Sequence, residues 1–369
     1  MKKIIIAPDS FKETMSNLEV TDIIYKTLYN KYPDYEYKLF PIADGGEGSL
    51  SAFYKTGGQL KSCLATCANF EKEEVNYLIY NDTIILEVAQ NVGFKYKHQT
   101  SNPGNTTTYG VGEVLKEALK TGLKKVCICL GGTITNDGGC GLASALGIKF
   151  FDKENNEFIP VGNTLKDICR IDNSLYLKQY NDINIIGLCD VTNPLHGLNG
   201  ASYIFSPQKG ADEKMVYDLD QGLKHLEKIV KNDLNVDKAD FQGSGAAGGI
   251  GYAIVALLGG KLQKGIDTIL DLIKFDQELT DDCVVITGEG KLDSQSLNGK
   301  VISGIIDRIK SSNTMVIVVC GKLEGKEEDY FKHGINKVVV TNEENLPFEI
   351  VKIKCKEQLE NAIKKIVLL

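Results

Sequence analysis

The chain has 369 residues, of which 43% are hydrophobic and 25% are charged, with 37 Gly, 10 Cys and no Trp. This composition is typical of a globular protein and excludes the disordered, collagen-like and disulfide-scaffold classes. The formal net charge of -7 comes without any basic cluster, so we expect no nucleic-acid partner.

The first part of the chain alternates strand and helix patterns. A continuous apolar run over 3–6 predicts a strand that is buried on both faces of a parallel sheet. Ser16 and Glu19 form a capping-box pattern, which predicts a helix over about 17–31. A second predicted strand and helix follow over 37–42 and 49–55. This βαβα order indicates a parallel sheet.

The pattern changes in the middle of the chain and returns near its end. Predicted strands in the middle cover 74–80, 83–88, 125–132 and 183–189, and the C-terminal third adds strands over 283–287, 315–320 and 337–341 and a helix over 298–310. We therefore predict a two-domain α/β protein. A discontinuous, doubly wound Rossmann-like domain comprises 1–60 and 276–369, a second α/β domain of 61–275 is inserted into it, and the active site lies in the cleft between them.

Apolar segments are too short to take the chain into or across a membrane. The longest fall well below the roughly 20 residues that a bilayer span needs. The apolar run after Met1 is also too short for a signal peptide. We expect a cytoplasmic protein with no membrane contact and with reduced cysteines.

Several predicted strands end in turns that combine glycines with carboxylate or amide side chains. These turns lie at 9–12, 44–48, 131–139, 189–193 and 288–293. Gly and Asp are also ordinary turn residues, so one such turn carries little weight, but five at strand ends are more informative. Ligands of open α/β sheets bind outside the carboxyl ends of the strands.

The same turns indicate the chemistry of the ligand. Glycines and helix N-termini accept phosphate, whereas carboxylates repel it unless Mg²⁺ is present. The combination therefore points to phosphoryl transfer. Lys12 and Lys209 lie beside turn residues and are candidates to contact phosphoryl or substrate carboxylate oxygens, with a solvated surface role as the alternative.

Other nucleotide motifs are missing or misplaced. No Gly-Lys pair is followed by Ser or Thr, so the common P-loop is absent. Residues 243–248 match the dinucleotide fingerprint, but the preceding segment is too polar for the strand that this motif requires. An NAD-dependent hydroxyacid dehydrogenase is therefore a weaker alternative.

The motifs together resemble those of the type I glycerate kinase family, in the same order and at matching spacing. They are IAPDSFK at 6–12, ADGGEG at 43–48, NP at 102–103, TTTYG at 106–110, TNDGG at 135–139, CDVTNPL at 189–195, NGAS at 199–202, SPQKGA at 206–211, GAAGG at 245–249, ITGEG at 286–290 and DSQ at 293–295. The match extends from residue 3 to about 300 and becomes general beyond about 320.

This resemblance implies an ATP- and Mg²⁺-dependent kinase that transfers the γ-phosphoryl group to D-glycerate and yields 2-phosphoglycerate and ADP. A kinase that yields 3-phosphoglycerate and a non-catalytic hydroxy-acid-binding sensor are the alternatives. The resemblance leaves open whether the protein forms a homo-oligomer.

Residue chemistry within these motifs suggests individual roles. Asp190 is our candidate general base, and Lys12 the candidate catalytic lysine. The candidate Mg²⁺ ligands are Asp44, Glu47, Glu289 and Asp293. The candidate substrate- and nucleotide-binding residues are Asp9, Ser10, Gly45, Gly46, Gly131, Gly132, Thr133, Asn136, Asp137, Gly138, Gly139, Asn193, Lys209, Gly288 and Gly290.

Overall fold

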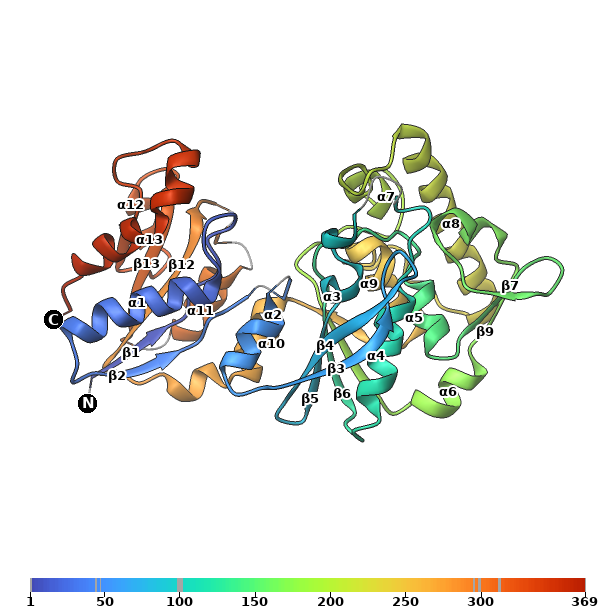
Figure 1. The fold of residues 1–369 in the computed structure, drawn as a ribbon, viewed down its shortest axis with the longest axis horizontal. Coiled ribbons are helices and arrows are strands. Elements are labelled where there is room, and N and C mark those ends of the chain that lie inside the picture. The colour runs from blue at the N-terminus through green and yellow to red at the C-terminus, as the bar shows by residue number, and fades with distance from the viewer. Residues whose placement is uncertain are drawn as a thin grey trace. The chain divides into compact units, whose positions relative to one another are not determined.

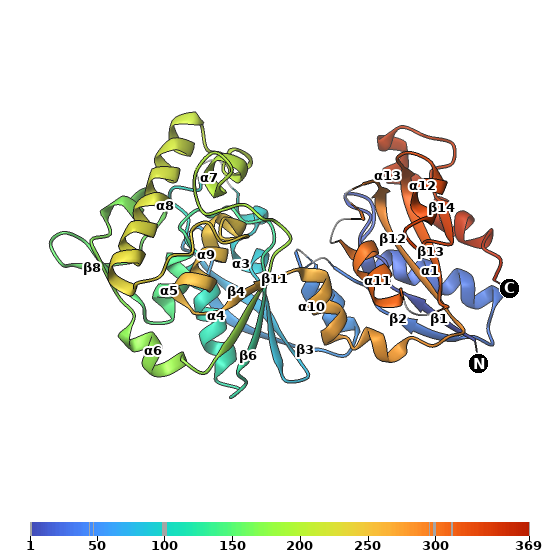
Figure 2. The same cartoon turned by 180° about the vertical axis from the view of Figure 1, so that it is seen from behind.

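The computed structural model describes residues 2–43, 45–46, 48–97, 102–294, 296–297, 300–310 and 313–368. The chain folds into two compact units (Figures 1 and 2). Unit 1 comprises Met1–Asp44, Ser51–Gly57 and Lys264–Leu369, and unit 2 comprises Gly45–Leu50 and Gly58–Gln263. The domain boundaries expected from the sequence, and a cleft between the domains, stay predictions.

Unit 1 is built on a five-stranded sheet whose neighbouring strands are all parallel, in the order β14-β13-β12-β1-β2. The strands are β1 (Lys3–Ile6), β2 (Glu36–Leu39), β12 (Cys283–Leu292), β13 (Met315–Leu323) and β14 (Lys337–Val340). After β1 the chain moves to one side of the sheet, and after β12 it moves to the other. The order of the strands therefore reverses between β1 and β12, as in doubly wound sheets.

Helices cover both faces of this sheet. On one face, α1 (Asn17–Lys31) and α13 (Phe348–Lys364) pack on β1, β12 and β13, and on the other face α11 (Val301–Ile309) and α12 (Glu327–Phe331) pack on β12, β13 and β14. Figure 1 looks onto α1, and Figure 2 looks onto α11. Unit 1 also contains α10 (Gly265–Leu272) and the short η6 (Phe275–Glu278), while α2 (Ser49–Lys55) spans the boundary between the units.

Local sequence signals explain where these elements begin. The Ser16 side chain accepts a hydrogen bond from the Glu19 amide, and the Glu19 carboxylate accepts one from the Ser16 amide, so the predicted capping box is confirmed. Ile4, Ile5 and Ile6 are fully buried, as expected for a strand covered on both faces. The predicted helix over 298–310 starts at Val301 among the described residues, and its first two positions lie outside them.

Unit 2 contains a six-stranded mixed sheet in the order β11-β10-β6-β5-β4-β3. Its strands are β3 (Gln59–Thr66), β4 (Lys72–Tyr80), β5 (Thr83–Glu87), β6 (Lys125–Cys129), β10 (Asn184–Leu188) and β11 (Lys261–Gln263). The pairs β3–β4 and β4–β5 are antiparallel, and the other pairs are parallel. A small antiparallel sheet, β8-β7-β9, is formed by Glu157–Phe158, Lys149–Phe151 and Arg170–Asp172.

The helices of unit 2 are α3 (Ala89–Val92), α4 (Tyr109–Leu119), α5 (Cys140–Ala145), α6 (Ser174–Tyr180), α7 (Ala201–Phe205), α8 (Glu213–Leu234) and α9 (Ile250–Tyr252), with 3₁₀ turns η1 (Phe94–Tyr96), η2 (Gly162–Asp167), η3 (Pro207–Lys209) and η4 (Ala246–Gly249). Helix α9 continues as a π-helical segment, Ala253–Leu257. Among the helices of the described residues, none combines the length and apolar character that a membrane crossing requires.

Candidate functional site

A cavity of about 490 Å³ lies in unit 1 at the carboxyl ends of β1, β12, β13 and β14. It lies at the point where the strand order reverses, which is where open α/β sheets bind their ligands. Its polar lining includes lysines and carboxylates in equal number, namely Lys12, Lys291, Lys300, Lys322, Asp9, Glu13, Glu289 and Asp293. A cavity of this size accommodates a ligand much larger than a three-carbon acid.

The turn after β1 presents Lys12 to this cavity. The backbones of Phe11 and Met15 bond to each other in both directions, at 2.9 and 3.0 Å, so the intervening residues form a tight projecting turn. Lys12 is exposed on this turn. Gly290 of strand β12 lies beside this turn, and a Cβ at that position would be in ordinary contact with the Lys12 amide nitrogen, at 3.4 Å.

Glu289 lies near the carboxyl end of β12 and is an acidic group of the cavity with a buried oxygen that is unpaired among the described residues. Its Oε1 is buried and has no hydrogen-bond partner within the described part of the chain. Burial raises the pKa of the Glu289 carboxyl, and the Ser296 hydrogen bond and the charge of Lys300 oppose that rise. Nearby Asp293 forms an ion pair with Lys291 at 3.2 Å. Glu289 therefore has an oxygen available for a ligand or a cation.

The Asp137 carboxylate lies fully buried inside unit 2 and is held by four donors. They are the Thr108 amide and hydroxyl, both at 2.8 Å, and the amides of Gly139 at 3.0 Å and Gly141 at 3.3 Å. Burial raises the pKa of Asp137, and these hydrogen bonds oppose the rise. The arrangement ties the 131–139 loop to the start of α4 and α5.

Asn136 is also fully buried and links the same loop to α7. Its amide nitrogen donates to the Ser202 hydroxyl at 3.1 Å, and its carbonyl oxygen accepts from the Ser206 hydroxyl at 3.1 Å. The Asn136 and Asp137 side chains of the TNDGG motif are thus engaged within the protein, whereas the buried hydroxyl of Thr135 has no hydrogen-bond partner among the described residues. Gly131 and Gly132, which precede them, lie nearer the surface.

Lys209 extends into this buried region. Its ammonium donates to the Thr135 carbonyl at 2.7 Å, and a longer contact of 3.4 Å reaches the Thr133 hydroxyl. The residue is only 2% exposed. Burial lowers the pKa of Lys209 to about 7, and attraction to Asp137 opposes this effect. Lys209 and Lys12 belong to different units.

The remaining candidates are spread over several turns. Asp190 is exposed just after β10, and the nearby Asn193 side chain donates to the Asn199 carbonyl at 2.8 Å. Gly288 is buried beside β13, where a Cβ would lie 2.1 Å from the Val319 carbonyl. Asp44 and Glu47 lie outside the described residues.

Glu87, a buried carboxylate at the end of β5, is not among the residues predicted from the sequence. It accepts hydrogen bonds from the amides of Gly48 at 3.1 Å and Leu50 at 3.0 Å. It therefore anchors the Gly45–Leu50 segment, whose Gly46 carbonyl also accepts from the Ser49 hydroxyl. The sequence signal that could have identified this residue is an acidic side chain at the end of an apolar strand.

The structure thus collects the candidates into two groups. Asp9, Ser10, Lys12, Glu289, Gly290 and Asp293 line one cavity of unit 1. Thr133, Asn136, Asp137 and Lys209 are all buried in unit 2, where Lys209 contacts Thr133 and is attracted to Asp137. Among the residues that the structure describes, no three His, Cys, Asp or Glu side chains form a ready-made metal site. Mg²⁺ in kinases needs fewer, because substrate phosphates and water supply the remaining ligands.

Comparisons with known proteins identify the family. The sequence profile of the glycerate kinase family matches residues 4–369. The chain is 40% identical to glycerate 2-kinase of Escherichia coli (strain K12) over 91% of this chain and 89% of that one. It is 38% identical to a glycerate kinase of Bacillus cereus (strain ATCC 10987 / NRS 248), again over 91% and 89% of the two chains.

A solved structure shows the same fold. A crystal structure from Salmonella typhimurium LT2, assigned provisionally as glycerate kinase 2, superposes with a TM-score of 0.85 at 35% identity and covers 99% of this chain and 96% of the other. The fold and the cavity at its strand ends are those of an α/β enzyme. The chain belongs to the glycerate kinase family. This confirms the predicted family, the α/β class and a phosphotransferase acting on an alcohol group.

Proposed function

We propose that this protein is an ATP-dependent kinase that phosphorylates D-glycerate at its 2-hydroxyl and releases ADP. Family membership supports the kinase reaction, and the E. coli relative at 40% identity is named a glycerate 2-kinase. The observation that carries the proposal is the unit 1 cavity, where lysines and carboxylates line the carboxyl ends of parallel strands. Lysines suit phosphoryl oxygens, and carboxylates suit their metal ion.

Glu289 and Asp293 are the described residues that fit a magnesium ion. Glu289 offers a buried oxygen without a partner, and Asp293 lines the same cavity. Asp44 and Glu47 remain candidates from the sequence alone. When bound with the nucleotide, Mg²⁺ would neutralise charge on the phosphates.

The transfer itself needs a base and a positioned phosphate. The glycerate hydroxyl oxygen forms a bond to the γ-phosphorus while the bond to the ADP oxygen breaks, and the hydroxyl proton passes to a carboxylate. We assign that carboxylate to Asp190, which follows a parallel strand of unit 2, and the phosphoryl contact to Lys12. For Lys209 and Asp137, their buried hydrogen bonds support a role in positioning the 131–139 loop.

Phosphorus NMR tests the reaction directly. The purified protein is incubated with D-glycerate, ATP and Mg²⁺, and matched samples omit glycerate or Mg²⁺. We expect a 2-phosphoglycerate resonance that appears only in the complete mixture. A 3-phosphoglycerate resonance would refute the 2-position and leave a kinase, whereas intact ATP without a new phosphoester would refute the kinase and favour the hydroxy-acid sensor.

A further inference from the structure

The unit 1 cavity has two ends of different chemistry. One end lies at the carboxyl ends of β1, β12 and β13 and is lined by the charged groups described above. The other end is lined by the loop after β14 and the first turns of α13, through Asn342, Asn345, Leu346, Phe348 and Val351. None of these five residues belongs to the sequence motifs. This second end has apolar walls and two amide side chains, and none of its five residues carries a charge.

Asn342 and Asn345 differ in whether their side-chain amides are available to hydrogen-bond a ligand. The Asn342 side chain closes its own loop, since it donates to the Leu346 carbonyl at 3.1 Å and accepts from the Leu346 amide at 2.9 Å. It also accepts from the Gln358 amide at 3.3 Å. Asn345 is exposed, and no hydrogen bond of its side chain to the described residues is found. Its amide can therefore pair with a ligand.

The apolar wall includes side chains that remain partly open to solvent. Phe348 is 45% exposed, although it contributes to the cavity lining, and Val351 is half-buried against the core under α13. Met15 lines the cavity from the turn after β1. A flat apolar ring of a ligand would cover such surface, and aromatic and aliphatic walls with a few polar groups are typical of small-molecule sites.

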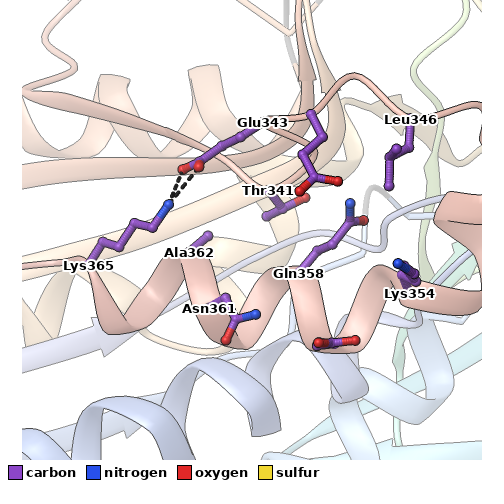
Figure 3. A pocket seen from close by; sticks show the side chains of 10 residues that line it. Thr341, Glu343, Leu346, Lys354, Gln358, Asn361, Ala362 and Lys365 are labelled. Atoms are coloured by element: carbon purple, nitrogen blue, oxygen red, sulfur yellow. Dashed lines mark hydrogen bonds and ion pairs between the residues drawn. The ribbon is translucent and has the colours of Figure 1, made fainter.

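A neighbouring cavity lacks these properties. It measures about 450 Å³ and lies between the same loop and the later turns of α13 (Figure 3). Its charged groups include Glu343 and Lys365, which neutralise each other in an ion pair at 2.6 Å (Figure 3). Thr341 and Leu346 line both cavities. Only the larger of the two reaches the ends of β1 and β12.

We propose that the uncharged end of the unit 1 cavity binds the purine base of the nucleotide. The base would lie against Phe348 and Val351, and Asn345 would hydrogen-bond its polar edge. The phosphates would then extend toward Lys12 and Glu289 at the other end. This inference rests on the proposed function for the identity of the ligand, and it assigns base recognition to a segment outside the family motifs.

Titration calorimetry with ADP, without glycerate, tests base binding independently of turnover. Val351→Trp fills the uncharged end and should weaken ADP binding by about tenfold or more. Ile353→Trp is the matched control, because Ile353 is 85% exposed on the same helix and does not line the cavity. It should leave the ADP dissociation constant within about twofold of the wild-type value. Tripolyphosphate, which has no base, should bind all three proteins alike.

A second pair of variants removes volume instead of adding it, so that steric overpacking cannot explain the result. Phe348→Ala should weaken ADP binding, while Ile350→Ala should not, because Ile350 is 40% exposed and lies outside the cavity. Asn345→Ala should reduce the preference for ADP over inosine diphosphate, since the two bases differ at the edge that an amide can recognise. Circular dichroism verifies that each variant is folded.

The outcomes separate this inference from the proposed function. Unchanged ADP binding in both Val351→Trp and Phe348→Ala would overturn the base site and leave the kinase proposal standing. Wild-type protein that fails to bind ADP would overturn the base site as well. Selective loss of ADP binding in a protein that forms no phosphoester would support the base site and refute the kinase.

Discussion

Replacement of Lys209 by Met tests whether burial lowers the pKa of this lysine and thereby destabilises the folded protein at neutral pH. The side chain is 2% exposed, and its principal partner is the Thr135 carbonyl at 2.7 Å. Burial lowers its pKa from 10.5 to about 7. Methionine has a similar length and removes both the titrating group and the hydrogen bond.

The direction in which stability changes with pH depends on whether the folded or the unfolded chain binds the Lys209 proton more tightly. Between pH 7 and 10.5 the unfolded chain binds the Lys209 proton, whereas the folded protein releases it. The free energy of unfolding therefore rises with pH in this window, by up to about 1.4 kcal/mol per pH unit. The full displacement of this pKa corresponds to about 5 kcal/mol, present as a penalty below pH 7 and absent above 10.5.

Lys209→Met removes this penalty but leaves the buried Thr135 carbonyl without its partner, at a cost of about 1–3 kcal/mol. The variant should thus be more stable than wild type by about 2 kcal/mol near pH 7.5. It should be less stable by a similar amount near pH 10.5, so the two curves should cross at about pH 9.

Urea unfolding followed by circular dichroism, at intervals from pH 7 to 10 with reductant present, measures both proteins. The difference in unfolding free energy between the two proteins removes the contributions of the other titrating groups, because both proteins share them. A difference that stays constant across this range would show that Lys209 does not change protonation on unfolding, and would refute the reasoning. Glycerate kinase activity gives an independent readout, because a positioning role tolerates Met better than direct contact with a phosphoryl group.

Three further substitutions test individual residues. Asp190→Asn should lower kcat by about 10²- to 10⁴-fold with a much smaller change in the KM for ATP, and near wild-type kcat would remove Asp190 as the base. Lys12→Ala should raise the KM for ATP or lower kcat in steady-state assays, and if neither changes, Lys12 is a surface charge. Gly248→Ala should destabilise unit 2 by about 3 kcal/mol or more in thermal unfolding, because φ is +67° and the new Cβ would lie 2.0 Å from the Thr135 carbonyl; an unchanged melting temperature would contradict this packing.

Short-range signals in the sequence identified much of the parallel-sheet unit. The apolar run at 3–6 and the capping box at Ser16 depend on neighbouring residues, so strand β1 and helix α1 could be predicted. Helix α8 is 22 residues long and amphipathic, yet it was not predicted, because it lies outside the glycine-rich and acidic turns that carry the motifs. The apolar segment from Ile250 begins as an α-helix and changes to π-helical geometry at Ala253, a change that depends on its packing rather than on a local sequence signal.

The sequence by itself determined the family, because the motifs occur in the family's order and spacing and contain the residue types that its reaction needs. It did not determine which polar residues reach solvent. Asn136 and Asp137 remain candidate ligand-binding residues, and their side chains are held by Ser202 and Thr108, which lie 66 and 29 residues away along the chain. Only the tertiary structure brings such distant partners together. Because burying a polar group without a hydrogen-bond partner costs much free energy, each buried side chain must be surrounded by groups that can pair with it.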